Sequence, residues 1–90
     1  MKRIYFFILV NSPACKRTQK RLIDIMEKIP QFREIPIEII DVLENPLIVE
    51  QLQITKFPTF WNKKGIISEG ERNKNQIHQM LENICDSENC

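Results

Sequence analysis

A hydroxyl and a thiol lie three residues apart near the start of the chain, at Ser12 and Cys15 in the segment Ser-Pro-Ala-Cys. Two thiols at this spacing at the start of a helix form a redox pair, in which one thiolate attacks a disulfide and the other resolves the mixed disulfide. A serine hydroxyl cannot take part in that exchange. The segment therefore predicts at most monothiol chemistry at Cys15, with glutathione as the co-substrate.

The expected position of Cys15 favours an ionised thiol. A helix beginning at Pro13 would place Cys15 in its first turn, where backbone amides and the helix dipole stabilise a thiolate. The cations of Lys16 and Arg17 would act in the same direction. The alternative is an ordinary cysteine at the start of a helix, and the residues alone leave both interpretations open.

The other side chains with chemical potential give weaker signals. Cys85 and Cys90 match neither the redox motif nor a zinc-ligand spacing, and three cysteines, an odd number, provide no self-contained disulfide framework. His78 is the single histidine, and we expect it on the solvated face of the last helix. We therefore expect no metal site and no cofactor.

The first helix is expected to carry a basic outer face, formed by Lys16, Arg17, Lys20 and Arg21. Such a face could dock an acidic protein partner, although charge runs of this kind are also common on solvated helices. The formal net charge is only +1, and the chain has neither a glycine-rich phosphate loop nor a nucleic-acid motif. We expect a protein partner, and neither nucleic acid nor a membrane.

Hydrophobic patterning predicts a strand, a helix and a second strand in the first half of the chain. The aromatic and β-branched run over 4–10 predicts a buried strand, and Asn11 or Ser12 is expected to cap a helix over 13–29. The apolar run over 37–42 is typical of a strand covered on both faces, and we expect it at the centre of the sheet.

The second half predicts a short helix followed by a hairpin. Asn45 and Pro46 suit the N-cap and first position of a helix that ends near Gln53. Two β-prone runs over 59–62 and 66–68 then flank Lys63, Lys64 and Gly65, which is typical of a tight hairpin turn.

A variant capping box predicts the start of the last helix. Asn73 and Gln76 have the required spacing, and Ile77, Leu81 and Ile84 would form the inward face. The elements then follow the order βαβαββα. A right-handed crossover makes the first two strands parallel and places helices against the sheet, so we expect a single three-layer α/β domain over 1–85 and a polar tail over 86–90.

Two short segments resemble known families. Asp-Val-Leu-Glu-Asn-Pro at 41–46 and the pair Pro58-Thr59 resemble the KaiB family, and 10–22 resembles its first strand, loop and helix more weakly, with Ser12-Pro13 in place of Thr-Pro. Phe57-Pro58-Thr59, the Lys63-Lys64-Gly65 hairpin and Gly70 also resemble the C-terminal half of thioredoxins. Both resemblances imply a thioredoxin-like fold with a central mixed sheet, and the second implies a cis bond before Pro58. Within these segments we expect a structural role for Asp41, Asn45, Pro46, Pro58 and Thr59.

The KaiB resemblance implies a protein-interaction module. Such a module would be a regulator of the circadian-clock type that docks on a KaiC-like ring ATPase, or a component of a signalling network with related domains. The basic residues of the first helix would contribute to that docking. The alternative function is a thiol-disulfide oxidoreductase or a glutathione-dependent monothiol enzyme, with Cys15 as nucleophile and with Ser12 and Pro58 bordering it.

KaiB proteins also adopt a second, tetrameric fold, so the resemblance implies that fold switching is accessible. The family's proline-rich segment after the Pro-Thr strand is absent here, and the strand, glycine turn and strand over 59–68 agree locally with the thioredoxin-like hairpin. We therefore expect mostly a monomer in the thioredoxin-like, partner-binding state.

The first residues superficially resemble a secretory signal. Met1-Lys2-Arg3 precede a short apolar run, and Cys15 follows at the distance of a lipidated cysteine. Removal of that run would delete the first strand of an otherwise complete fold. We expect one domain in a reducing cytoplasm, because 90 residues do not require disulfides to fold.

Overall fold

Two parallel strands and an antiparallel hairpin form a single mixed sheet in the computed structural model, which describes residues 3–88. The sheet has the order β2-β1-β3-β4. Its strands are β1 (Ile4–Ile8), β2 (Ile37–Asp41), β3 (Thr59–Asn62) and β4 (Gly65–Glu69). The helices are α1 (Pro13–Lys28), α2 (Pro46–Gln51) and α3 (Lys74–Glu88), and a 3₁₀ helix, η1, spans Pro30–Glu34. The element order and the mixed sheet confirm the predicted fold class.

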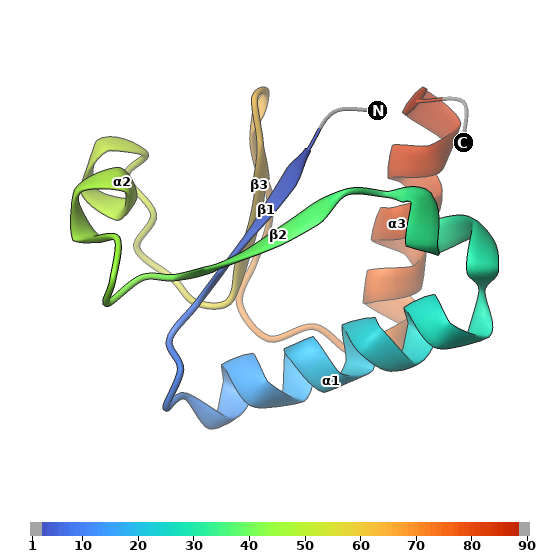
Figure 1. The fold of residues 1–90 in the computed structure, drawn as a ribbon, viewed down its shortest axis with the longest axis horizontal. Helices are drawn as coiled ribbons and strands as arrows, with labels where there is room; N and C mark the ends of the chain where they lie inside the picture. Colours follow the sequence, from blue (N-terminus) through green and yellow to red (C-terminus); the bar gives the residue numbers. More distant parts are fainter. Residues whose placement is uncertain (1–2, 89–90) are drawn as a thin grey trace.

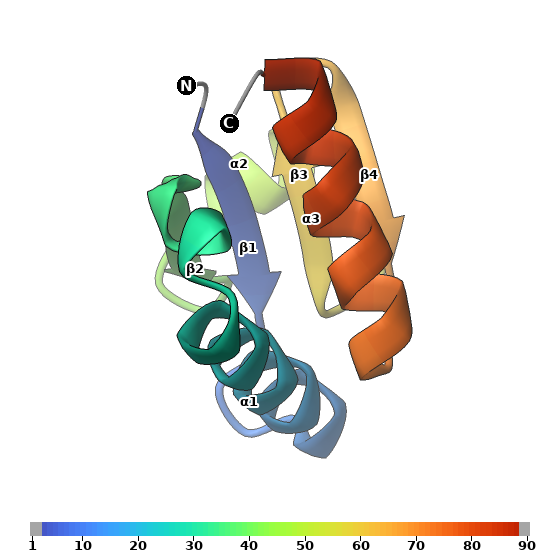
Figure 2. The ribbon, with the colours of Figure 1, turned by 90° about the vertical axis from the view of Figure 1, so that its right-hand side faces the viewer.

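Helices cover both faces of the sheet (Figures 1 and 2). On the face covered by α1 and α3, Phe6 stacks on Phe60 with ring centroids 4.2 Å apart. Phe7 points to the opposite face, where it packs with Val42, Ile54 and the apolar side of α2. The core is therefore divided by the sheet, and the three-layer prediction is confirmed.

β2 lies at the edge of the sheet, which corrects the prediction that the apolar strand over 37–42 is central. It pairs with β1 alone, and its Ile39 is 45% exposed. The two inner strands are β1 and β3, and Phe6 and Phe7 of β1 are buried. The position of a strand depends on which strands pair with it, so a continuous apolar run alone does not distinguish an edge strand from a central one.

Side-chain caps fix the starts of the two long helices. Ser12 caps α1, and its Oγ accepts a hydrogen bond from the Cys15 N–H at 3.3 Å. Before α3, the Asn73 N–H donates to Gln76 Oε1 at 2.9 Å, and the Gln76 N–H donates to Asn73 Oδ1 at 2.8 Å. This reciprocal pair is the predicted capping box, and it satisfies two amides that no helical carbonyl can reach.

Asn45 precedes α2 as predicted but does not cap it through its side chain. Its Nδ2 instead donates to the Asp41 carbonyl at 3.0 Å, and Asp41 Oδ1 accepts from the Leu43 N–H at 3.0 Å. Both side chains stabilise the turn after β2. Pro46 is the first residue of α2, as predicted, and the helix ends at Gln51.

The turn between β3 and β4 is tight, as predicted. Asn62 Oδ1 accepts the Lys64 N–H at 2.9 Å, and Gly65 has a φ of 121°, a conformation that other residues rarely adopt. The peptide bond between Phe57 and Pro58 is cis, as the thioredoxin resemblance implied.

α3 continues to Glu88, so the polar segment predicted as a tail over 86–90 begins inside this helix. Cys90 lies outside the described residues, and the position of the domain boundary stays a prediction. Between residues 3 and 88, no helix has both the length and the apolar character that a membrane span requires.

Replacement of Phe6 should test the stacked core. We expect Phe6→Ala to lower the free energy of unfolding by about 3–5 kcal/mol, because the change leaves a cavity beneath α1 and α3. Ile23→Ala, at an exposed position of α1, is the matched control and should change it by less than about 0.5 kcal/mol. Urea denaturation measures the stability of both variants. Equal transition midpoints for Phe6→Ala and Ile23→Ala would contradict the assignment of Phe6 to the core.

Candidate functional site

Cys15 lies in the first turn of α1 with its thiol turned into the core. It is 1% exposed, belongs to the cluster beneath α1 and α3, and is a free cysteine. Its Sγ accepts a hydrogen bond from the Leu9 N–H at 3.3 Å. The structure therefore places the sulfur at a helix start, as predicted, but away from the surface where a disulfide substrate would approach.

Ser12 is the more accessible member of the pair. The residue is half-buried, and its hydroxyl oxygen is occupied by the Cys15 N–H. Exchange between two thiols would require a sulfur at this accessible position, and here a cap oxygen occupies it. The pair therefore supports the helix start and has no complete exchange chemistry.

Pro58 lies in a buried turn before β3. Its carbonyl accepts the Gly70 N–H at 2.8 Å, and the hydroxyl of neighbouring Thr59 donates to the Lys56 carbonyl. Phe57 packs against the clusters on both faces of the sheet. These contacts give Pro58 and Thr59 the structural environment expected of them and tie the turn to the segment that follows β4.

Glu71 binds two of the four basic side chains that were predicted to dock a partner. Arg17 donates to both carboxylate oxygens, from Nε to Oε2 and from Nη2 to Oε1, each at 2.8 Å. Arg21 Nη1 donates to Oε2 at 2.9 Å. We call Glu71, Arg17 and Arg21 the Glu71 clasp. It joins α1 to the start of the segment leading into α3.

The clasp perturbs the acidity of its carboxyl group. Hydrogen bonds from Arg17, and then from Arg21, lower the pKa of Glu71 from 4.5 to about 2. The hydrogen bond to Glu71 also raises the pKa of Arg17 above its usual value. Paired guanidinium and carboxylate groups of this kind are common in structural roles as well as at functional sites.

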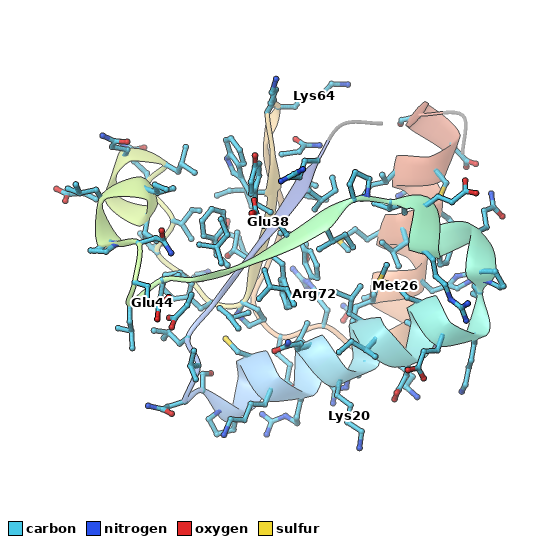
Figure 3. The ribbon with its side chains drawn as sticks, viewed as in Figure 1. Lys20, Met26, Glu38, Glu44, Lys64 and Arg72 are labelled. Atoms are coloured by element: carbon cyan, nitrogen blue, oxygen red, sulfur yellow. The ribbon has the colours of Figure 1, made fainter. Side chains whose placement is uncertain are left out.

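Arg72 extends this connection into the core. Its N–H donates to the Thr18 hydroxyl at 3.4 Å, its carbonyl accepts from Arg21 at 3.0 Å, and its Nε donates to Ser68 Oγ at 2.7 Å. Figure 3 shows Arg72 between α1 and the sheet. Thr18 is fully buried, so this network fixes one side of α1 against the end of β4.

Lys16 and Lys20 remain exposed on α1, and no ion pair joins either of them to another residue between 3 and 88. Figure 3 shows the Lys20 side chain pointing away from the molecule. The predicted basic face therefore divides into two arginines engaged within the chain and two lysines available to a partner.

Exposed apolar side chains follow the ends of β1 and β2. Leu43 and Leu47 are 66% and 70% exposed, and Val10 is also exposed. β1 and β2 are parallel neighbours, and the Val42 N–H donates to the Ile8 carbonyl at 3.0 Å, so the loops after both strands lie at the same edge. We call Val10, Leu43 and Leu47 the strand-end surface.

The remaining candidates lie elsewhere. His78 Nδ1 is 3.7 Å from Glu82 Oε1 on the surface of α3, and its ring meets Phe32 edge-on at 5.4 Å. Cys85 is buried in the core beside α1. Within the part of the chain that the structure describes, no group of three His, Cys, Asp or Glu side chains could hold a metal ion.

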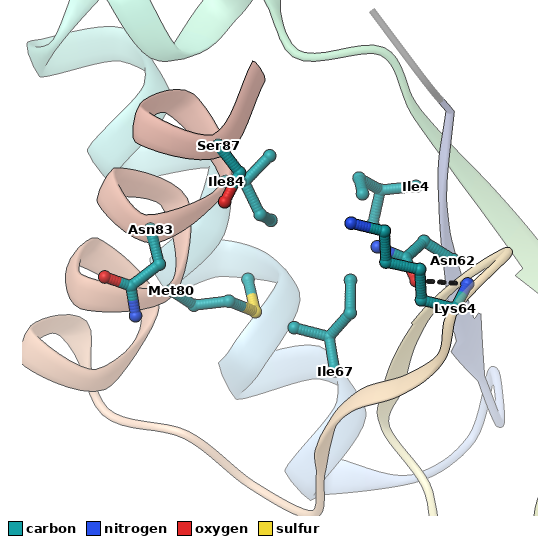
Figure 4. Close-up of a pocket in the computed structure, with 8 residues that line it drawn as sticks. All are labelled: Ile4, Asn62, Lys64, Ile67, Met80, Asn83, Ile84 and Ser87. Carbon is teal, nitrogen blue, oxygen red and sulfur yellow. Dashed lines mark hydrogen bonds between the residues drawn. The ribbon is translucent and has the colours of Figure 1, made fainter. Parts of the chain in front are cut away.

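A cavity of about 190 Å³ lies at the opposite end of β1 from Ser12 (Figure 4). Ile4, Ile67 and Met80 form its apolar wall, and Lys64 and Asn83 contribute polar groups. Lys64 is the single charged residue among those lining it. The cavity brings together no acid–base pair and no nucleophile.

The similarity of this chain to known proteins lies in its fold. No protein-family model matches the chain, and no curated protein sequence matches it. Among solved structures, thioredoxin 1 from the thermophilic eubacterium Thermosipho africanus is 25% identical, with a TM-score of 0.68 over 98% of this chain and 99% of that one. Chloroplastic thioredoxin z is 23% identical, with a TM-score of 0.73 over 93% and 78%. The oxidised thioredoxin from Plasmodium falciparum is 21% identical, with a TM-score of 0.71 over 91% and 79%.

These similarities show that the protein is a single α/β domain with the thioredoxin-like fold. No family model and no sequence match points to KaiB in particular. The similarities therefore do not extend from the thioredoxin-like fold to KaiB.

The pH dependence of stability should report the Glu71 clasp. The folded pKa of about 2 lies below the ordinary 4.5, so the clasp stabilises the fold fully above about pH 4.5 and loses that effect as the pH falls through about 2. We expect Glu71→Gln to be less stable than the wild type at neutral pH, with the difference shrinking on acidification.

The matched control for this experiment is Glu44→Gln, because Glu44 is exposed and forms no ion pair with another described residue. Urea midpoints at pH 7 and at successively lower pH compare the three proteins, and added salt should also narrow the gap. Parallel profiles for wild type and Glu71→Gln would contradict the clasp.

Proposed function

We propose that the protein is a thioredoxin-like interaction module that acts by docking on a protein partner and performs no thiol-disulfide exchange. The observation that carries this proposal is the arrangement of Ser12 and Cys15. The single free thiol among the described residues is 1% exposed, and the accessible position of the pair holds a hydroxyl.

Exchange chemistry requires a sulfur that a disulfide can approach in line. The Cys15 thiol contacts the core and accepts the Leu9 N–H, so it would have to leave both environments before it could attack. A second thiol would also be needed to resolve the product without glutathione. Docking requires neither condition.

The docking surface that we infer combines the strand-end surface with the free lysines of α1. Val10, Leu43 and Leu47 offer apolar contacts, and interfaces of this kind place apolar anchors inside a polar rim. Lys16 and Lys20 supply positive charge on the helix that begins at the same edge. The partner that fits is a protein with an acidic surface around an apolar patch.

The family resemblance supports a more specific partner. The segment over 41–46 and the pair Pro58-Thr59 resemble KaiB, so we propose a KaiC-like ring ATPase as the partner, or a signalling protein with a related domain. A role in a circadian clock and a cytoplasmic location follow from the same resemblance and from the sequence, and both stay predictions.

We also propose that the protein is mostly a monomer in the thioredoxin-like state. The tight turn at Gly65 and the capped start of α3 agree with this fold at the local level, and such agreement favours one folded conformation over alternatives. Size-exclusion chromatography with light scattering should give the mass of one 10.7 kDa chain at micromolar concentration. A dominant tetramer in dilute solution would contradict this prediction.

An affinity pull-down from host lysate with ATP should separate docking from thiol chemistry. We expect wild type and Cys15→Ser to retain the same ring ATPase or signalling protein, because docking does not use the thiol. The double variant Lys16→Glu, Lys20→Glu should retain at least about tenfold less partner than the wild type, because the reversed charges repel an acidic surface.

The matched control reverses two other lysines, Lys28 and Lys64, and should retain the partner. Loss of binding in both charge-reversal variants would mean that net charge, and not the proposed surface, determines retention. Calorimetry would then measure the affinity of the purified partner for the wild-type protein and for each variant. No binding to any protein of this class would contradict the proposed partner.

The second candidate is a monothiol enzyme with Cys15 as its nucleophile. The similarity to solved thioredoxins favours it. Under this alternative the wild type alone would retain client proteins or a reductase, reductant would release them, and Cys15→Ser would lose them. That result would replace docking as the proposed function.

A further inference from the structure

The sheet face on the α2 side is only partly covered. α2 has six residues, whereas the opposite face is covered by the two long helices α1 and α3. An apolar cavity of about 320 Å³ remains between α2 and the sheet. Ile48 and Leu52 line its helix side, and Phe7 and two further aromatic residues line its sheet side.

Three aromatic rings lie next to one another in this cavity. The ring centroids of Tyr5 in β1 and Trp61 in β3 are 5.8 Å apart, and the ring planes meet at 49°. The ring centroids of Tyr5 and Phe7 are 6.5 Å apart, and their planes meet at 35°. This tilted arrangement presents both ring faces and ring edges. A planar aromatic guest can therefore make offset or edge-to-face contacts with the wall.

The residues that line the cavity carry three polar side-chain groups: the Lys63 ammonium, the Tyr5 hydroxyl and the Trp61 indole N–H. Lys63 is the single charged residue that lines the cavity, and no ion pair joins it to another residue between 3 and 88. The Tyr5 hydroxyl likewise has no hydrogen-bond partner within that range. An apolar cavity with an unneutralised ammonium group is suited to an anionic group carried on an apolar body.

We propose that this cavity binds a small aromatic carboxylate. The ring system would lie against Tyr5 and Trp61, and the carboxylate would pair with Lys63 and accept a hydrogen bond from the Tyr5 hydroxyl. The volume of about 320 Å³ is near the lower end of the range of about 300–1,000 Å³ typical of ligand pockets, which fits one or two fused rings. The cavity shares no lining residue with the strand-end surface, so it is a second site beyond the proposed docking function.

Trp61 provides a direct readout, because it is the single tryptophan in the chain. Its indole N–H gives one assignable signal in a two-dimensional amide NMR spectrum. We expect 2-naphthoate to shift this signal with a dissociation constant of about 1 mM or tighter, as a ligand of that size allows. The neutral 2-naphthamide should bind at least about twofold more weakly.

Two neighbouring lysines give the matched variants. Lys63→Gln should weaken 2-naphthoate about two- to fivefold, the range expected for one partly solvated ion pair, and should leave 2-naphthamide unchanged. Lys64→Gln, at the next residue of the same hairpin, should change neither ligand. Because both variants alter exposed side chains, both should keep the wild-type spectrum elsewhere.

Several outcomes would overturn the proposal. One is no shift of the Trp61 signal at millimolar 2-naphthoate, and another is equal binding of acid and amide. A third is shifts confined to residues lining the cavity beside Lys64. A Trp61 signal that moves with protein concentration in the absence of ligand would show that a second copy of the chain covers this face, which would also overturn it.

Discussion

β1 has to bury large side chains on both of its faces, and the arrangement of the molecule follows from that constraint. Phe6 stacks on Phe60 beneath α1 and α3, and Phe7 points into the layer formed with α2. A strand of this kind requires helices on both sides of the sheet. β2 and β3 flank β1 and complete its backbone hydrogen bonds, so β1 is the element that every layer contacts.

The packing around β1 also determines the properties of Cys15. The chain turns back shortly after Ile8 so that α1 can place Leu22 over the same core cluster as Phe6. The inner side of the first helical turn then faces the sheet, and Cys15 occupies that side. The Leu9 N–H satisfies the sulfur there. A residue type that suggests reactivity in the sequence is thus placed by the packing of its helix, and Ser12 is left with the cap.

Local patterns in the sequence predicted most of the fold, but they did not predict the contacts between segments that are distant in the sequence. The Ser12 cap, the Asn73–Gln76 box and the tight turn at Gly65 depend on residues within a few positions of one another, and all are present. The edge position of β2 depends on which strands lie beside it. The ion pairs to Glu71 join residues separated by 54 and 50 positions, so the outer face of α1 gave no sign that two of its four cations are engaged.

The thioredoxin-like fold leaves the function of the chain to its surface. The buried contacts of Phe6, Phe7 and Phe60 are sufficient to specify the layers, and they do not involve Leu43, Leu47 or Lys63. Exposed side chains can change with little effect on stability, since most surface substitutions alter it only slightly. Solved thioredoxins that are 21–25% identical to this chain can therefore share its fold while their surfaces recognise other molecules. The aromatic cavity combines both kinds of residue, because its Phe7 belongs to the buried core and its Lys63 is exposed.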